Sequence, residues 1–127
     1  MNTDKKQFKY KAITDKILKG FYEVYNELGF GFLESVYENA LFIALNDYGL
    51  QVKQQFPIQV KFRSKVVGEF RADLLVEEKI TLELKAVKHI VPEHQAQMIN
   101  YLKATDIEVG LLLNFGEKPE FKRFIFN

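Results

Sequence analysis

The chain has 127 residues, 47% hydrophobic and 28% charged, which is the size and composition of one globular domain and excludes disordered and fibrous proteins. Lys and Arg number 18 and Asp and Glu 17, a net charge of +1, so binding through one large basic field is not expected, although a local basic patch stays open. The absence of Cys excludes disulfides and thiolate zinc sites. No apolar run could span a bilayer, and the N-terminus lacks the hydrophobic stretch of a signal peptide, so we expect a cytoplasmic protein.

Two helices are predicted in the first part of the chain, after a polar arm over residues 1–11. Apolar residues recur at steps of three and four over 13–28 and again over 33–48, which is typical of amphipathic helices. The Gly-Phe-Gly sequence at 29–31 separates the two helices, and Gly49 is placed to end the second.

Three strands are predicted next, because the hydrophobic pattern changes to strict alternation over 58–63, 69–76 and 80–87. Pro57 indicates that the first strand begins near that residue, or has an edge or bulge there. Polar breaks separate the three segments, so an antiparallel meander is the simplest arrangement.

A helix over 92–104 follows, since Pro92 and Glu93 suit the first turn of a helix. The continuous apolar run 109–115 predicts a strand buried on both faces, parallel to the third strand through a right-handed crossover. A short last strand is expected over 121–126. The order α-α-β-β-β-α-β-(β) predicts a mixed α/β (α+β) fold in a single domain over 1–127.

The chemistry centres on the predicted hairpin formed by the second and third strands. If residues 77–79 form its loop, Asp73 lies opposite Glu83 and Arg71 opposite Lys85, all on one face. Two opposed carboxylates are compatible with a divalent cation such as Mg²⁺, and the two basic residues with an adjacent anion. These are the groups that metal-assisted phosphodiester hydrolysis needs.

The same residues also permit a purely structural interpretation. Asp73 can pair diagonally with Lys85, and Arg71 with Glu83, to give an ordinary charged outer face. Taken alone, the hairpin pattern favours this interpretation, because charged hairpins far outnumber metal sites.

Two helical pairs provide further candidates. Glu34 and Tyr37 lie three residues apart at the start of the second helix, and Gln97 and Tyr101 lie four apart on the helix over 92–104, so each pair shares a face. Each pair also has a structural alternative. Glu34 complements the helix dipole and Tyr37 belongs to the core. Gln97 and Tyr101 lie on a half-exposed helix face.

The chain resembles the GxxExxY proteins, which are grouped with the PD-(D/E)XK nuclease-like superfamily. The resemblance covers roughly residues 13–126 and rests on the segments Gly31-x-x-Glu34-x-x-Tyr37, Asp73-Leu74-Leu75-Val76, Glu83-Leu84-Lys85-Ala86-Val87 and Gln97-x-x-x-Tyr101-Leu102. It implies a restriction-endonuclease-like core of order α-β-β-β-α-β, a central mixed sheet flanked by helices, with the first helix as an addition. Ala72 stands where many members have a Pro before the Asp.

The resemblance also implies roles for these residues. Asp73 and Glu83 match acids that bind Mg²⁺ or Mn²⁺, the Leu84 carbonyl would be a further ligand, and Lys85 matches the catalytic lysine. Glu34 matches an acid of the core's first helix that binds or orients metal or water. The Gln97 and Tyr101 pair resembles a motif that supports the site or contacts nucleic acid.

The first hypothesis is therefore a metal-dependent nuclease acting on DNA or RNA. The alternative is a catalytically inactive module on the same fold that binds nucleic acid or a protein partner. A homodimer also stays open, because the aromatic tail 121–126 could cover a sheet edge or meet another chain.

Overall fold

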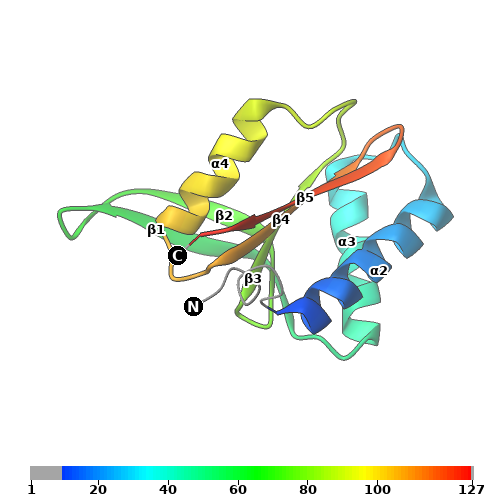
Figure 1. Cartoon of the computed structure of the whole chain (residues 1–127), viewed down its shortest axis with the longest axis horizontal. Coiled ribbons are helices and arrows are strands. Elements are labelled where there is room, and N and C mark those ends of the chain that lie inside the picture. Colours follow the sequence, from blue (N-terminus) through cyan, green and yellow to red (C-terminus); the bar gives the residue numbers. More distant parts are fainter. Residues whose placement is uncertain (1–9, 127) are drawn as a thin grey trace.

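Helices and strands follow one another in the expected order in the computed structural model, which describes residues 10–126 (Figure 1). Their bounds are α2 Lys11–Leu28, α3 Glu34–Asp47, β1 Val52–Phe62, β2 Lys65–Val76, β3 Ile80–Lys85, α4 Pro92–Lys103, β4 Val109–Phe115 and β5 Pro119–Ile125. The predicted arm over 1–11 falls mostly outside the described residues, and Lys11 already belongs to α2. Within residues 10–126, no helix is long and apolar enough to cross a membrane.

The strands form one sheet in the order β1-β2-β3-β4-β5. Strands β1, β2 and β3 pair antiparallel in sequence, which confirms the predicted meander, and β3 pairs parallel with β4 as expected. Strand β5 contains most of the aromatic tail and pairs antiparallel with β4. The result is the mixed α/β fold that the sequence predicted, with α2 as the additional helix before the core.

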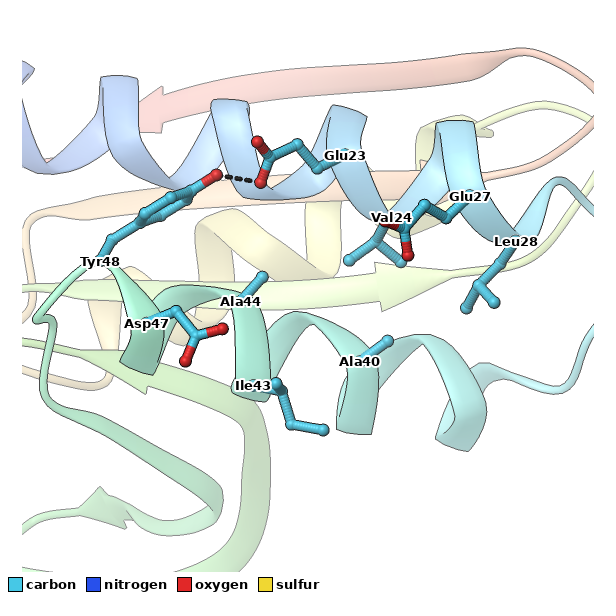
Figure 2. Close-up of a pocket in the computed structure, with 9 residues that line it drawn as sticks. All are labelled: Glu23, Val24, Glu27, Leu28, Ala40, Ile43, Ala44, Asp47 and Tyr48. Carbon is cyan, nitrogen blue, oxygen red and sulfur yellow. Dashed lines mark hydrogen bonds between the residues drawn. The ribbon is translucent and has the colours of Figure 1, made fainter.

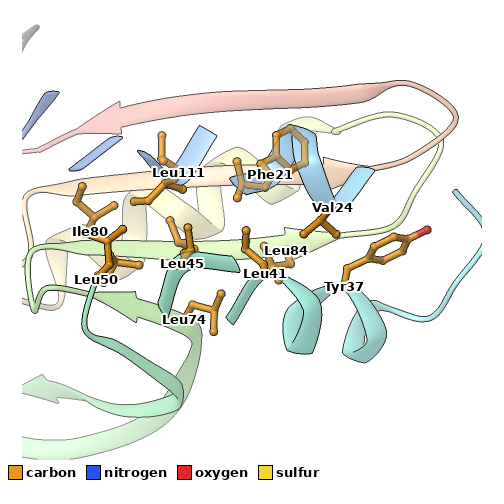
Figure 3. Packing of buried hydrophobic residues seen from close by; sticks show 14 of the residues in the cluster. Phe21, Val24, Tyr37, Leu41, Leu45, Leu50, Leu74, Ile80, Leu84 and Leu111 are labelled. Carbon is orange, nitrogen blue, oxygen red and sulfur yellow. The ribbon is translucent and has the colours of Figure 1, made fainter. Parts of the chain in front are cut away.

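Helices α2 and α3 cover one face of the sheet and α4 lies on the other (Figures 1 and 3). Phe21 of α2 and Leu41 and Leu45 of α3 are buried against Leu-rich β3 and β4. Gly20 permits the close contact of the two helices, since a Cβ there would lie 3.0 Å from a methyl of Leu45. On the other face, Met98 and Leu102 of α4 pack with Leu112 of β4 and, at the edge, Phe124 of β5. Burial on both faces explains the unbroken apolar sequence of β4.

The β1–β2 ribbon differs most from the prediction. Strand β1 begins at Val52 rather than near residue 58, and Pro57 lies in its middle, opposite Arg71. The strand accommodates this proline because β1 is an edge strand, where a missing N–H leaves no neighbour unpaired. The two strands turn at Arg63 and Ser64, both with positive φ, and extend away from the rest of the molecule as a long ribbon (Figure 1).

Candidate functional site

A tight turn sets the register of β2 against β3. The pairs Leu74 with Leu82, Leu75 with Thr81, and Val76 with Ile80 are those that a loop over 77–79 requires. Glu77 and Glu78 both adopt positive φ to make this turn. The predicted register is confirmed over these pairs, and the next residues along the two strands are Asp73 and Glu83.

Backbone pairing between β2 and β3 stops where the two acids begin. The backbone N–H of Asp73 donates a hydrogen bond of 3.3 Å to Oε2 of Glu83, and the backbone N–H of Leu84 donates one of 2.7 Å to Oδ2 of Asp73. Each carboxylate thus accepts from the opposite strand's backbone. The ladder ends before both predicted pairs, so neither Asp73 and Glu83 nor Arg71 and Lys85 are paired through their backbones.

Burial and mutual repulsion set the electrostatics of the two acids. Glu83 is only 7% exposed. Its burial, and after that the charge of Asp73, raises the pKa of Glu83 to about 8. Burial also raises the pKa of Asp73, against the opposing effects of the Leu84 N–H, Gln55 and Lys85. The two carboxyls therefore form one coupled site that resists carrying two negative charges.

Lys85 and Glu34 have opposite electrostatic effects on this acid pair. Lys85 lies at the end of β3, and its ammonium favours the ionised form of both Asp73 and Glu83. Glu34, exposed as the first residue of α3, acts on Glu83 in the opposite sense. Four of the five predicted charged residues, Glu34, Asp73, Glu83 and Lys85, thus act on one another electrostatically.

Tyr101 of α4 is also within electrostatic reach of the acids. Burial, followed by the charges of Glu83 and Asp73, raises the pKa of its phenol to about 12, so the hydroxyl keeps its proton at neutral pH. Its ring stacks on Phe70 of β2, with centroids 3.7 Å apart and planes 11° apart. Gln97 lies one turn earlier on α4 and is exposed.

Tyr37 lies in the core rather than at the acids. Its ring is fully buried and stacks on Phe115, with centroids 4.3 Å apart. Its hydroxyl donates to the Gly29 carbonyl at 2.6 Å and accepts from the Phe32 N–H at 3.2 Å. Tyr37 therefore fixes the conformation of residues 29–32, which lead into Glu34 and the first turn of α3.

Gln55 is a neighbour of Asp73 that the sequence did not single out. Its side-chain amide donates to Oδ1 of Asp73 at 3.3 Å and to Oε1 of Glu38 at 2.7 Å, so it links β2 to α3. Its φ of 51° is unusual for a residue within a strand. Its backbone carbonyl accepts from the Arg71 guanidinium at 3.5 Å. Nothing in the polar run Lys53–Gln55 signals this bend.

Asn114 is a second residue that the sequence analysis missed. It is fully buried, and its side chain both accepts from the Val87 N–H at 3.0 Å and donates to the Val87 carbonyl at 2.9 Å. These bonds hold the segment that follows Lys85. The signal was an Asn inside the apolar run of β4, because a buried amide needs partners.

The donor chemistry of the site suits a hard divalent cation. Carboxylates and a backbone carbonyl such as that of Leu84 are the oxygen donors that Mg²⁺ and Mn²⁺ take. Mg²⁺ commonly binds one or two carboxylates and completes its shell with water and substrate phosphate. Across residues 10–126, no group of three or more acidic or His side chains forms a ready-made metal centre. The residues present therefore fit an ion held by two carboxylates and shared with a substrate.

Comparison with known proteins agrees with this fold. A family model described as the PD-(D/E)XK nuclease superfamily matches residues 11–124. The chain therefore belongs to the PD-(D/E)XK nuclease superfamily, and this membership indicates a nuclease-type function. No curated protein matches the chain.

Among solved structures, the chain is similar to the crystal structure of SSO0001, with a TM-score of 0.57 and 17% sequence identity. The similarity covers 72% of this chain and 50% of that one, so the chain corresponds to about half of the length of that protein. At this identity the similarity supports the fold.

Proposed function

We propose that this chain is a metal-dependent nuclease of the GxxExxY type, which hydrolyses phosphodiester bonds in DNA or RNA. The observation that carries the proposal is the buried contact between Asp73 and Glu83, with Lys85 beside both. Two acids in one low-dielectric site cannot both stay ionised without a cation, and superfamily membership supports a divalent metal ion in that role.

In this proposal Asp73, Glu83 and the Leu84 carbonyl hold Mg²⁺ or Mn²⁺. When bound, the ion would polarise the scissile phosphate and lower the pKa of a water molecule. The raised pKa of Glu83 means that the site binds a proton near neutral pH in the absence of metal, and this proton must leave when the site takes a cation.

The other side chains act on substrate and geometry. The Lys85 ammonium would neutralise charge that develops on the phosphate. The protonated Tyr101 hydroxyl would donate to a phosphate oxygen, with Gln97 one turn away on the same helix. Glu34 would orient a water molecule, and Tyr37 would support Glu34 by fixing the start of α3.

A cleavage assay tests this function. Labelled single- and double-stranded DNA and RNA are incubated with Mg²⁺ or Mn²⁺, with and without chelator. We expect metal-dependent cleavage that falls at least about 100-fold in Asp73→Asn and Glu83→Gln, and is unchanged in Glu69→Gln, which removes an exposed acid of β2. Equal cleavage by Asp73→Asn and the native chain would refute the mechanism.

A second candidate function is a catalytically inactive module that binds nucleic acid. It is favoured by one observation: Asp73 and Glu83 each accept a backbone hydrogen bond across the strands, as a structural acid pair would. This function requires salt-sensitive binding that weakens in Arg71→Ala or Lys85→Ala, with no turnover in any metal. A homodimer stays a prediction that sedimentation in dilute solution tests, and a protein partner stays a prediction as well.

A further inference from the structure

A groove of about 720 Å³ lies next to the candidate site, between α4 and the β1–β2 ribbon. Gln59 and Lys61 of β1, Phe70 of β2 and Asn100, Tyr101 and Lys103 of α4 line it. Its walls therefore combine aromatic rings, uncharged polar groups and two ammonium groups, without an acidic side chain among its lining residues.

Tyr101 connects this groove to the acids. The same ring that lines the groove and stacks on Phe70 stands close enough to Glu83 and Asp73 for both carboxylates to act on its hydroxyl. A polymer with one phosphate at the acids would thus have its neighbouring residue in the groove.

Local charge supports an anionic occupant. Residues 56–68, which form the outer part of the ribbon, contain Lys61, Arg63 and Lys65 and no Asp or Glu, although the whole chain has a net charge of only +1. All three basic residues are exposed, and Lys103 at the end of α4 lines the groove together with Lys61. This is the local basic patch that the overall composition left open.

A second groove differs from the first because it is lined by acidic side chains. It lies between α2 and α3, has a volume of about 340 Å³ and is lined by Glu23, Glu27 and Asp47 (Figure 2). Its carboxylates would repel a phosphate backbone. Of these two hollows, only the one between α4 and the ribbon suits nucleic acid.

We propose that the groove between α4 and the β1–β2 ribbon binds unpaired nucleotides adjacent to the scissile phosphate, so that the substrate is single-stranded at that position. This inference rests on the proposed nuclease function. A volume of about 720 Å³ is that of a small-molecule pocket, which accommodates about one or two nucleotides. Bases stack on the Phe70 and Tyr101 wall, and the Lys61 and Lys103 ammonium groups contact phosphates.

The test measures binding without cleavage. Fluorescence anisotropy is recorded in chelator with labelled 12-nucleotide DNA and RNA single strands and the corresponding duplexes, for the native chain and for Lys61→Ala/Lys103→Ala. We expect the native chain to prefer single strands. The double variant should bind them about 10-fold more weakly, and its salt slope should be lower by about 0.7 for each phosphate that a lysine no longer neutralises.

The matched control is Lys16→Ala/Lys19→Ala, which removes two exposed lysines from α2 on the opposite side of the sheet. Its affinity should stay within about 2-fold of the native chain. Phe70→Leu, whose fold is checked by circular dichroism, should weaken single-strand binding about 5-fold or more with an unchanged salt slope. The DNA and RNA arms show which polymer is preferred.

Three results would overturn the inference: no single-strand binding by the native chain at low salt, equal preference for duplexes, or native affinity in Lys61→Ala/Lys103→Ala. These results are distinguishable from failure of the nuclease proposal. If the groove variants bind single strands more weakly but the native chain cleaves nothing, the groove proposal is supported and the nuclease proposal is refuted. If the native chain cleaves nucleic acid but the groove variants bind with native affinity, the nuclease proposal is supported and the groove proposal is refuted.

Discussion

Replacing Glu83 by Gln should stabilise the metal-free protein, and the gain should grow with pH. The folded chain holds a proton on Glu83 up to a pKa of about 8, whereas an unfolded chain releases it near 4.5. Since the folded state then binds more protons, its stability falls as pH rises from about 4.5 to about 8 and levels off above that. Glu83→Gln keeps the size of the side chain and its capacity to accept from the Asp73 N–H, but it cannot ionise.

The size of the effect follows from the pKa. A rise from 4.5 to about 8 corresponds to about 5 kcal/mol, at about 1.4 kcal/mol for each pKa unit. We therefore expect the free energy of unfolding of Glu83→Gln, relative to the native chain, to increase by about 3–5 kcal/mol between pH 4.5 and pH 8.5.

Urea denaturation in chelator across this pH range measures the difference. Glu69→Gln controls for the loss of one exposed carboxyl and should change stability by less than about 0.5 kcal/mol. A difference between Glu83→Gln and the native chain that stays constant with pH would refute the reasoning, because burial would then not hold Glu83 neutral. A companion melt at pH 8 should show that Mg²⁺ stabilises the native chain, by about 2.7 kcal/mol at 100 times its Kd, but not Glu83→Gln.

Three further substitutions test how the site is supported. Asn114→Ala removes both side-chain bonds to Val87 and should lower the free energy of unfolding by about 2–4 kcal/mol; a decrease below about 1 kcal/mol in urea would contradict this. Gly116→Ala would place a Cβ 2.3 Å from the Val87 carbonyl oxygen and should cost about 1–3 kcal/mol, whereas Gly68→Ala, with no atom within 4 Å of its Cβ, should cost nothing in the same thermal melts. Tyr37→Phe keeps the buried ring but removes two hydrogen bonds and should cost about 1–2 kcal/mol in urea; unchanged stability would show that the hydroxyl does not fix the turn before α3.

Hydrophobic periodicity predicted the order of the elements and the neighbourhood of Asp73 and Glu83. It succeeded because a one-residue slip between β2 and β3 would have placed Asp73 opposite Leu84 and mixed charged with apolar residues on one face, so the hydrophobic pattern selects the register. It could not predict that the ladder ends at the acids, because that depends on side chains competing with the backbone for its N–H groups.

Local conformation was the other source of error. Periodicity contains no information on the positive φ of Gln55, which turns an ordinary polar residue toward Asp73. Pro57 left a strand start, an edge or a bulge open, and the edge is what the structure has, since β1 pairs on one side only. Asn114 was visible as a polar residue in an apolar strand, but its partner Val87 is distant in sequence and close only in the fold.

The outer part of the β1–β2 ribbon pairs only with itself, since β2 joins β3 through Leu74–Val76 alone. Its amides should therefore exchange with solvent deuterium through local opening, faster than those of β3 and β4 and without global unfolding. Such a segment can change in length or sequence while the buried core stays intact. If the groove binds nucleic acid as proposed, substrate preference diverges among relatives through this ribbon, independently of the acids next to it.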